Sequence, residues 1–345
     1  MLRTGSRFFA AAILAIVIAA SGTGAQQTGA PPFATTKVEG TDNVYVFRNG
    51  GHQAMFVMTP DGVIATDPIA YGRPTGGQTY LDEIRKVTDK PVKYVIYSHH
   101  HFDHVAGGKA LKDAGAIFIA HRRAKERLEA IRDPHTVIPD EAVSDSGRTI
   151  TLGGTRLELT YHGLNHSDSN LVMRLPKEKI LFVVDTLPVG QVPGRAMIDF
   201  HPLEAETFIK EVLALEWDRL IPGHPGPNGR LGTKKDAQDQ LALLQAASAE
   251  MKKLAQDGKC WDAAEKEFKL AGYESWPGYA NNLQFVARRY VRCGDAAPDR
   301  PCSANRDTRS TRRYPVQRRW RPTRDARLLI QVEIPRDAHS VPIQF

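Results

Sequence analysis

Several features are absent from this chain of 345 residues, and each absence argues against a class of function. There is no glycine-rich nucleotide-binding motif and no nucleophilic Ser or Cys elbow. Only three cysteines are present, and none lies near the histidine-rich motifs, whereas structural zinc sites are usually closed and rich in Cys. After residue 25, no segment approaches the roughly 18 consecutive apolar residues of a membrane-spanning helix. We therefore expect a mature protein that does not span a membrane.

The central part of the chain also lacks net charge. Residues 26–294 contain 33 basic and 33 acidic residues, so the formal charge of +7 comes from the two ends. A broad basic face is the usual electrostatic footprint of nucleic-acid binding, and this balance does not provide one. We expect a small-molecule substrate and no nucleic-acid partner; the sequence leaves the oligomeric state open.

Residues 1–25 have the pattern of a secretory signal peptide. Arg3 and Arg7 precede an uncharged apolar run from Phe8 to Ala20, and small residues follow at 23–25. The apolar run is too short to span a bilayer comfortably, which favours a cleaved signal over the alternative of an uncleaved anchor. This pattern predicts a periplasmic or secreted protein.

Two of the cysteines, Cys260 and Cys293, flank a predicted helical segment near the end of the central part. In an oxidising compartment they could form a disulfide that leaves Cys302 unpaired. Three free or buried thiols are the alternative, because spacing alone does not fix connectivity.

The C-terminal segment, residues 295–345, differs in composition from the rest. It contains 11 Arg, no Lys and six Pro, with one strand-like run at Leu328–Ile334. Low apolar content and a net charge of +5 predict a mostly disordered extension. A basic surface-binding arm and an out-of-frame C-terminus are the two alternatives.

Between these ends, short β-prone runs alternate with helical segments. Strands are predicted at Asn43–Arg48, Ala54–Thr59, Val63–Asp67, Val92–Ser98, Ala116–Ala120, Thr149–Leu152, Arg156–His162, Asn170–Leu175, Ile180–Asp185 and Leu220–Ile221. Helices are predicted at Thr79–Val87, Gly107–Ala114, Arg122–Arg132, Leu203–Leu215 and Lys234–Lys253, with more helix to about Arg292. Strands and helices, followed again by strands and helices, predict two β-rich halves packed together with helices outside, an α/β sandwich. The predicted domain is 26–294, with a helical extension from about 233.

A histidine-rich motif directly follows the strand at Val92–Ser98. The segment reads His99-His100-His101-Phe102-Asp103-His104, which contains His-x-His-x-Asp-His. His99 and His101, two residues apart in extended chain, point the same way, and neutral imidazole is the commonest nitrogen ligand of zinc. Asp103 and His104 follow on the turn and can face a second ion.

Three further candidate ligands lie downstream, each of them after a predicted strand. They are His166, Asp185 and His224. Together with the motif they provide seven nitrogen and oxygen ligands, which is enough for two metal ions.

This set of motifs resembles the metallo-β-lactamase-fold superfamily of metallohydrolases, over residues 37–255. The resemblance extends to its exported members, the periplasmic quinoprotein-associated zinc hydrolases and lactamase-like proteins. It implies a four-layer αββα sandwich with two metals, two Zn²⁺ or alternatively Fe or Mn, at one edge between the sheets. It implies first-metal ligands His99, His101 and His166, second-metal ligands Asp103, His104 and His224, and a bridging Asp185.

The resemblance also suggests roles for residues around the metals. Asp67 matches the family's usual buried Asp beneath the site, where it would orient the ligands. His52, beside the predicted Asn49–Gly51 hairpin turn, and His201 are candidate substrate contacts.

The chemistry that these ligands predict is metal-dependent hydrolysis. Three His on one ion leave a position open for water, and the metal lowers the pKa of that water toward about 7. Asp103 is a candidate catalytic residue that orients the hydroxide and relays a proton. The expected scissile bond is an ester, thioester, lactone, lactam or phosphodiester.

Two alternatives to this general hydrolase remain. A β-lactamase proper is one, although in true lactamases of this fold the residue at the position of Asp185 is usually Cys or Ser. A non-catalytic metal-binding or di-iron redox protein is the other.

Overall fold

The computed structural model describes residues 32–195, 198–259 and 261–290. The predicted signal peptide, the three cysteines and the segment 295–345 lie outside these residues, so the expectations for them stay predictions. Among the described residues, no helix is both long and apolar enough to cross a membrane.

Seven strands form the first sheet, in the order in which they occur along the chain. They are β1 (Phe33–Lys37), β2 (Val44–Asn49), β3 (His52–Thr59), β4 (Gly62–Thr66), β5 (Val92–Ile96), β6 (Ile117–His121) and β7 (Glu141–Val143). Strands β1 to β4 pair antiparallel, and β4 to β7 pair parallel. The segments that follow β4, β5 and β6 therefore leave from one edge of this sheet.

Five strands form the second sheet, in the order β12-β11-β10-β9-β8. They are β8 (Arg148–Leu152), β9 (Thr155–Thr160), β10 (Val172–Leu175), β11 (Ile180–Val183) and β12 (Arg219–Pro222). The strands pair antiparallel except for β11 and β12, which are parallel and align Val183 with Pro222. The chain segments after these two residues therefore emerge side by side.

Three apolar layers stack through the molecule. One lies between the two sheets and contains Met55 and Phe182. Alternate residues of β11 face opposite ways: Leu181 and Val183 belong to the layer beneath the helices that follow the second sheet, and Val184 returns to the layer between the sheets. A strand that is apolar on both faces is typical of a sheet buried on both sides.

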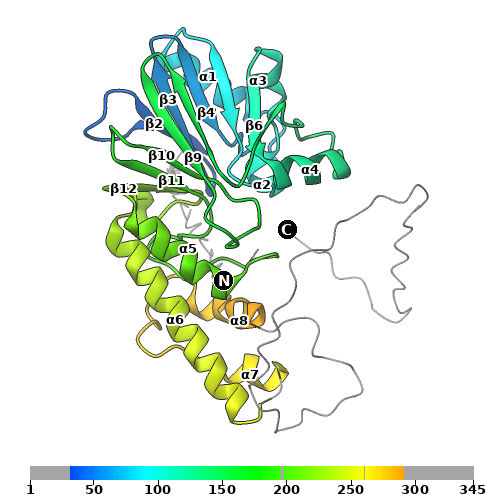
Figure 1. The fold of residues 1–345 in the computed structure, drawn as a ribbon, viewed down its shortest axis with the longest axis vertical. Helices are drawn as coiled ribbons and strands as arrows, with labels where there is room; N and C mark the ends of the chain where they lie inside the picture. The colour runs from blue at the N-terminus through cyan, green and yellow to red at the C-terminus, as the bar shows by residue number, and fades with distance from the viewer. Residues whose placement is uncertain (1–31, 196–197, 260, 291–345) are drawn as a thin grey trace, which may run out of the picture. The chain divides into compact units, whose positions relative to one another are not determined.

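Helices cover the outer face of each sheet (Figure 1). On the first sheet these are α1 (Gly76–Val87), α3 (Lys109–Asp113) and α4 (Arg122–Ile131), which bury residues such as Tyr80 and Leu128. On the second they are α5 (Pro202–Ala214), α6 (Lys234–Gln256), α7 (Trp261–Glu267) and α8 (Tyr279–Arg289). The predicted four-layer αββα sandwich is thus confirmed.

Three short elements were not expected from the sequence. Strand β1 has five residues, β7 has three, and helix α2 (Phe102–Val105) has four. Segments this short do not complete a periodic pattern, and β1 and β7 are defined by their pairing with β2 and β6 rather than by local sequence. Helix α2 is important for the site because it lies inside the histidine-rich motif.

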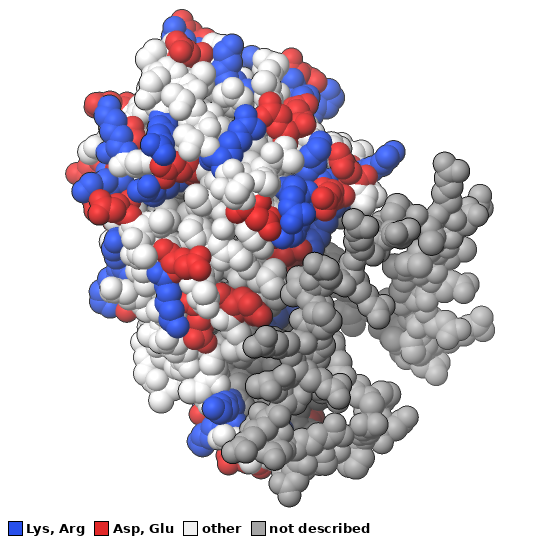
Figure 2. Space-filling model, in the orientation of Figure 1, with Lys and Arg blue, Asp and Glu red and all other residues white. Residues whose placement is uncertain are grey.

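The charged surface matches the balanced composition. Figure 2 shows Lys and Arg interspersed with Asp and Glu over the face drawn, without a broad patch of either sign. This face offers no extended basic surface to a nucleic acid.

Candidate metal centre

The segment after β5 carries the first part of the candidate site. The carboxylate of Asp67, directly after β4, accepts the backbone N–H of Ser98 at 2.8 Å and so ties the two strand ends together. Helix α2 then begins after His101, which has extended backbone (φ −72°, ψ 138°). After this turn, Asp103 and His104 belong to one group of possible metal ligands, and His99 and His101 belong to another.

The segments after β9 and β11 carry His166 and Asp185. The side-chain oxygen of Asn165 accepts the backbone N–H of His166 at 2.6 Å and the hydroxyl of Thr186 at 2.8 Å. Asp185 has a positive φ of 64°, a conformation that costs free energy for a non-glycine residue and is found at functional sites. Asn165 thus links the two segments, and the strained backbone aims the Asp185 carboxylate.

The segment after β12 places His224. Gly223 precedes it, and a Cβ atom there would lie 2.4 Å from Val184 Cγ1 and 3.0 Å from Asp185 Oδ1. Only a glycine lets the backbone approach the site this closely. The Nδ1–H of His224 donates to the carbonyl of Gly51 at 2.7 Å, which fixes the ring and leaves Nε2 facing the site.

The predicted ligands form two groups that meet at Asp185. The first group is His99, His101, His166 and Asp185, and the second is His52, Asp103, His104 and His224; within each, the ligand atoms lie within 4.8 Å of one another. Asp185 belongs to both by distance. Its Oδ2 lies 3.3 Å from His166 Nε2 and 3.2 Å from His104 Nε2, and its Oδ1 lies 3.2 Å from His224 Nε2.

Several buried polar atoms in this centre have no hydrogen-bond partner. Among the described residues these include His99 Nε2, His104 Nε2 and Asp185 Oδ1. His101 Nδ1 and His166 Nε2 face each other at 2.9 Å. Buried polar atoms are normally satisfied, and converging imidazole nitrogens and carboxylate oxygens are the ligands that zinc prefers. The residues present therefore fit two divalent ions.

Burial favours the neutral form of two histidines of the first group, His99 and His166. Burial and the neighbouring imidazoles hold the pKa of His99 well below its usual value. Burial also lowers the pKa of His166 to about 4, although Asp185 acts in the opposite direction. A neutral imidazole has the free lone pair that metal binding requires.

Nearby carboxylates control the pKa of His104 in the second group. Burial acts to lower the pKa of His104, but Asp185, Asp103 and Asp67 raise it to about 10. Burial acts to raise the pKa of Asp185, but His104, His224 and His166 hold it well below its usual value. His104 therefore keeps a positive charge next to these carboxylates. A bound metal cation can replace the proton that carries this charge.

Outer contacts hold several ligands in place. The Nε2–H of His101 donates to Asp199 Oδ1 at 2.7 Å, and Ser98 Oγ lies 2.9 Å from His99 Nδ1. Fully buried Asp67 places its second oxygen 3.7 Å from His104 Nδ1, which is beyond hydrogen-bond distance. Outer hydrogen bonds such as those of His101 and His99 orient the rings of ligating histidines.

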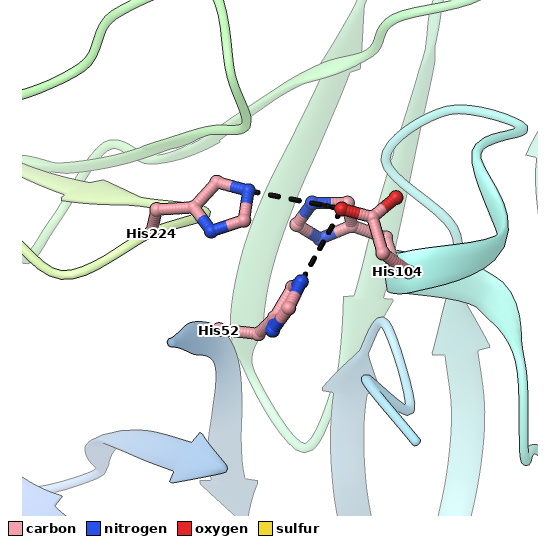
Figure 3. A group of neighbouring side chains, drawn as sticks. His52, His104 and His224 are labelled. Carbon is pink, nitrogen blue, oxygen red and sulfur yellow. Dashed lines mark hydrogen bonds and ion pairs between the residues drawn. The ribbon is translucent and has the colours of Figure 1, made fainter. Parts of the chain in front are cut away.

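The two candidate substrate contacts, His52 and His201, lie in different places. His52, on the hairpin between β2 and β3, lies against Asp103 and His224 in the second group (Figure 3). His201 instead precedes α5, where its backbone N–H donates to the carbonyl of Asn165 at 2.7 Å, and it belongs to none of the three groups of described residues that could hold a metal ion.

Sequence reasoning missed Asp199 and Arg73, which contact site histidines from two separate loops. Asp199 is bonded to His101, and Arg73 Nη2 lies 3.3 Å from His52 Nδ1. Neither residue belongs to a motif, so only the folded loops reveal them.

Comparison with known proteins identifies relatives of this arrangement. Residues 74–227 match the model of the metallo-beta-lactamase superfamily. Over 195 residues, covering 56% of this chain and 58% of the relative, the sequence is 25% identical to the 2,4-dinitroanisole O-demethylase subunit alpha of Nocardioides sp. (strain JS1661). The chain spans little more than half the length of the curated relatives it matches.

Solved structures show the same fold. A metallo-beta-lactamase from Pontibacter korlensis matches with a TM-score of 0.53 and 21% identity, over 62% of this chain and 99% of that one. A stereoselective inverting sec-alkylsulfatase from Pseudomonas sp. matches with a TM-score of 0.60 and 17% identity, over 77% of this chain and 51% of that one. At these identities the likeness establishes the fold rather than a shared substrate.

Proposed function

The chain belongs to the metallo-beta-lactamase superfamily, and we propose that it is a hydrolase that binds two metal ions, Zn²⁺ in the first instance. The imidazole-rich ligand set favours zinc over magnesium or calcium. Iron or manganese in its place would change the cofactor but not the site.

The position of Asp185 is the observation that carries this proposal. One of its oxygens lies 3.3 Å from His166 Nε2, in the first group, and the other lies 3.2 Å from His224 Nε2, in the second. A carboxylate between two groups of histidines is suited to bridge two ions. Paired ions of this kind, about 3.5–4 Å apart, are typical of two-metal hydrolases.

The ions would supply a hydroxide nucleophile at neutral pH and polarise the bond to be broken. The protein's contribution is to position the ligands and to move protons. Asp103, with 32% of its side chain exposed, lies at the open side of the second group. Burial acts to raise its pKa, but the hydrogen bond from His52 and the charge of His104 hold it well below the usual value. As an ionised carboxylate it can orient the nucleophile.

The scissile bond that we propose is an ester, thioester, lactone, lactam or phosphodiester. The carboxylate at position 185 favours this broad group over β-lactamases proper, in which Cys or Ser usually takes that place. Hydrolysis of β-lactams is the second candidate, favoured by the likeness to metallo-beta-lactamases.

A substrate panel tests the proposal. The zinc-loaded protein should hydrolyse at least one of a β-lactam, a thioester, a lactone, an aryl ester, a phosphodiester and a sec-alkyl sulfate. His101→Ala should abolish that activity, and His135→Ala should keep it, because His135 is exposed and its side chain has no part in the site.

Two outcomes would contradict the proposal. Absence of bound transition metal after loading would remove the metal-dependent chemistry. Two bound ions without turnover on any substrate of the panel would favour the rival function, a non-catalytic metal-binding or di-iron redox protein.

We also propose that the protein acts in the periplasm or outside the cell. The support is the signal-like sequence of residues 1–25. Appearance of the protein in a periplasmic or culture fraction, with a new N-terminus near Gln26, is the expected result.

A further inference from the structure

We propose that His52 is a positioning residue of the second metal site: Arg73 fixes its ring so that its Nε2–H donates to Asp103, and it is not itself a metal ligand. The inference rests on the proposed two-metal site and assigns a role to a residue outside the seven predicted ligands.

The hairpin between β2 and β3 brings His52 to the site. Asn49 and His52 pair across the turn, and the intervening Gly50 has a positive φ of 61°. The carbonyl of Gly51 accepts from His224 Nδ1 at 2.7 Å. The hairpin is thus held to the end of β12, and the rings of His52 and His224 lie 4.6 Å apart.

By distance alone, His52 could be a fourth ligand. Its Nε2 lies 3.2 Å from Asp103 Oδ2, and that oxygen lies 3.4 Å from His104 Nε2 and 3.8 Å from His224 Nε2. Ligand atoms around a tetrahedral zinc with bonds of about 2.0–2.1 Å are separated by roughly 3.4 Å. A different observation is needed to decide between a ligand and a hydrogen-bond donor.

The hydrogen bonds of Arg73 distinguish between these two roles. Its Nη1 donates to the carbonyls of Ile69 at 3.3 Å and Tyr71 at 3.4 Å, and its Nη2 donates to His52 Nδ1 at 3.3 Å. A guanidinium group has donors and no acceptor, so His52 Nδ1 must be the unprotonated nitrogen. In a neutral imidazole the proton is then on Nε2, the atom that faces Asp103.

A protonated Nε2 cannot bind a metal ion, but it can hold a ligand in place. Asp103 lies on a four-residue helix, and 32% of its side chain is exposed. The N–H of His52 would fix one oxygen of Asp103 while a second lone pair of the same oxygen remains available to the ion. Hydrogen bonds of this kind to ligating carboxylates tune metal affinity.

Three variants and two measurements test this role. His52→Ala should weaken binding of the second zinc ion by about 10–100-fold, the range typical of an outer hydrogen-bond partner, with the first ion unaffected. His52→Gln, whose amide can still donate to Asp103, should recover most of that affinity. Arg73→Gln should give a smaller loss, because either tautomer of His52 then becomes available. Competition titration with a zinc indicator measures these affinities.

Nitrogen-15 NMR of the His52 ring provides the second measurement. The expected result is a proton on Nε2 and none on Nδ1, in both the metal-free and the zinc-loaded protein. Direct coordination would instead appear as a metal-bound Nε2 in the loaded protein, with His52→Gln as damaging as His52→Ala, and this result would overturn the proposal. Unchanged affinity in His52→Ala would overturn it as well.

The same experiments separate this inference from the proposed function. If the wild-type protein binds fewer than two ions, the two-metal hydrolase fails. The hydrogen bonds among Arg73, His52 and Asp103 exist without metal, so the tautomer measured in the metal-free protein still supports or overturns the orientation of His52.

Discussion

The backbone at Gly223 lies so close to the carboxylate of Asp185 that a Cβ atom there would be 3.0 Å from Asp185 Oδ1. The same atom would lie 3.0 Å from His104 Cε1 and 2.4 Å from Val184 Cγ1. The parallel pairing of β11 and β12 forces this approach, because it aligns the residues at which the two strands end. One glycine therefore sets the distance between the carboxylate of Asp185 and the segment that carries His224.

Gly223→Ala should consequently damage the second metal site. The added methyl group must displace Val184 or the carboxylate of Asp185, at a cost of about 1–3 kcal/mol in the free energy of unfolding. We expect the affinity for the second ion to fall at least tenfold, measured by competition titration. Gly194→Ala is the matched control, because a Cβ atom there meets no atom within 4 Å. Wild-type affinity in Gly223→Ala would contradict the close approach.

Asp185→Asn tests whether the carboxylate bridges two metal ions, with almost no change in the shape of the side chain. The amide keeps the size of the side chain but removes the negative charge that faces both groups of histidines. We expect turnover to fall by more than about 100-fold, beyond the 10–100-fold effect of an outer hydrogen-bond partner. Metal content should fall from two ions towards one, as elemental analysis can check. A variant that retains two ions and near-native turnover would show that Asp185 does not bridge them.

The sequence predicted the parts of the site that follow from strand ends. His99, Asp185 and His224 each come directly after a buried strand, and parallel pairing places such residues at one edge. The sequence also predicted that Asp103 and His104 follow on the turn after His101 and can face a second ion, although the short helix α2 at this turn was not expected. His99, Asp185 and His224 lie within two or three residues of a strand, whereas His166 lies six residues from both β9 and β10.

The residues that support the ligands were harder to predict. Asp199 and Arg73 lie in loops, and the fold of the loops rather than any periodic pattern brings them to His101 and His52. His52 itself was expected near the substrate, but its contact with Asp103 depends on the side-chain direction at the hairpin. Long-range contacts of this kind leave no local signal in a single sequence.

Binding of the second ion should depend on pH in a direction set by His104. Burial acts to lower the pKa of His104, but Asp185 and the other nearby carboxylates raise it to about 10. The metal-free protein thus carries a proton on His104 at pH 7, and an ion that binds its Nε2 must release that proton. Affinity should therefore rise with pH, by up to about tenfold per unit between pH 6 and pH 8.

Calorimetric titration at pH 7 in two buffers of different ionisation enthalpy measures the protons released. About one proton per second-site ion is expected from His104. Absence of net proton release, together with affinity that stays constant from pH 6 to pH 8, would show that His104 is already neutral in the metal-free protein.

Asp199 should matter for the first metal ion through His101. Its Oδ1 accepts the Nε2–H of His101 at 2.7 Å, and its Oδ2 lies 3.4 Å from His100 Nε2. This bond keeps the proton on Nε2 of His101 and leaves the Nδ1 lone pair, which lies 2.9 Å from His166 Nε2, for the ion. Asp199→Ala should weaken the affinity for the first ion by about 10–100-fold. Asp199→Asn, whose amide oxygen can still accept the bond, should lose much less, and Asp218→Ala, at an exposed position, should lose nothing. Equal losses for the Ala and Asn variants would mean that the charge of Asp199, and not the orientation of the His101 ring, supports the ion.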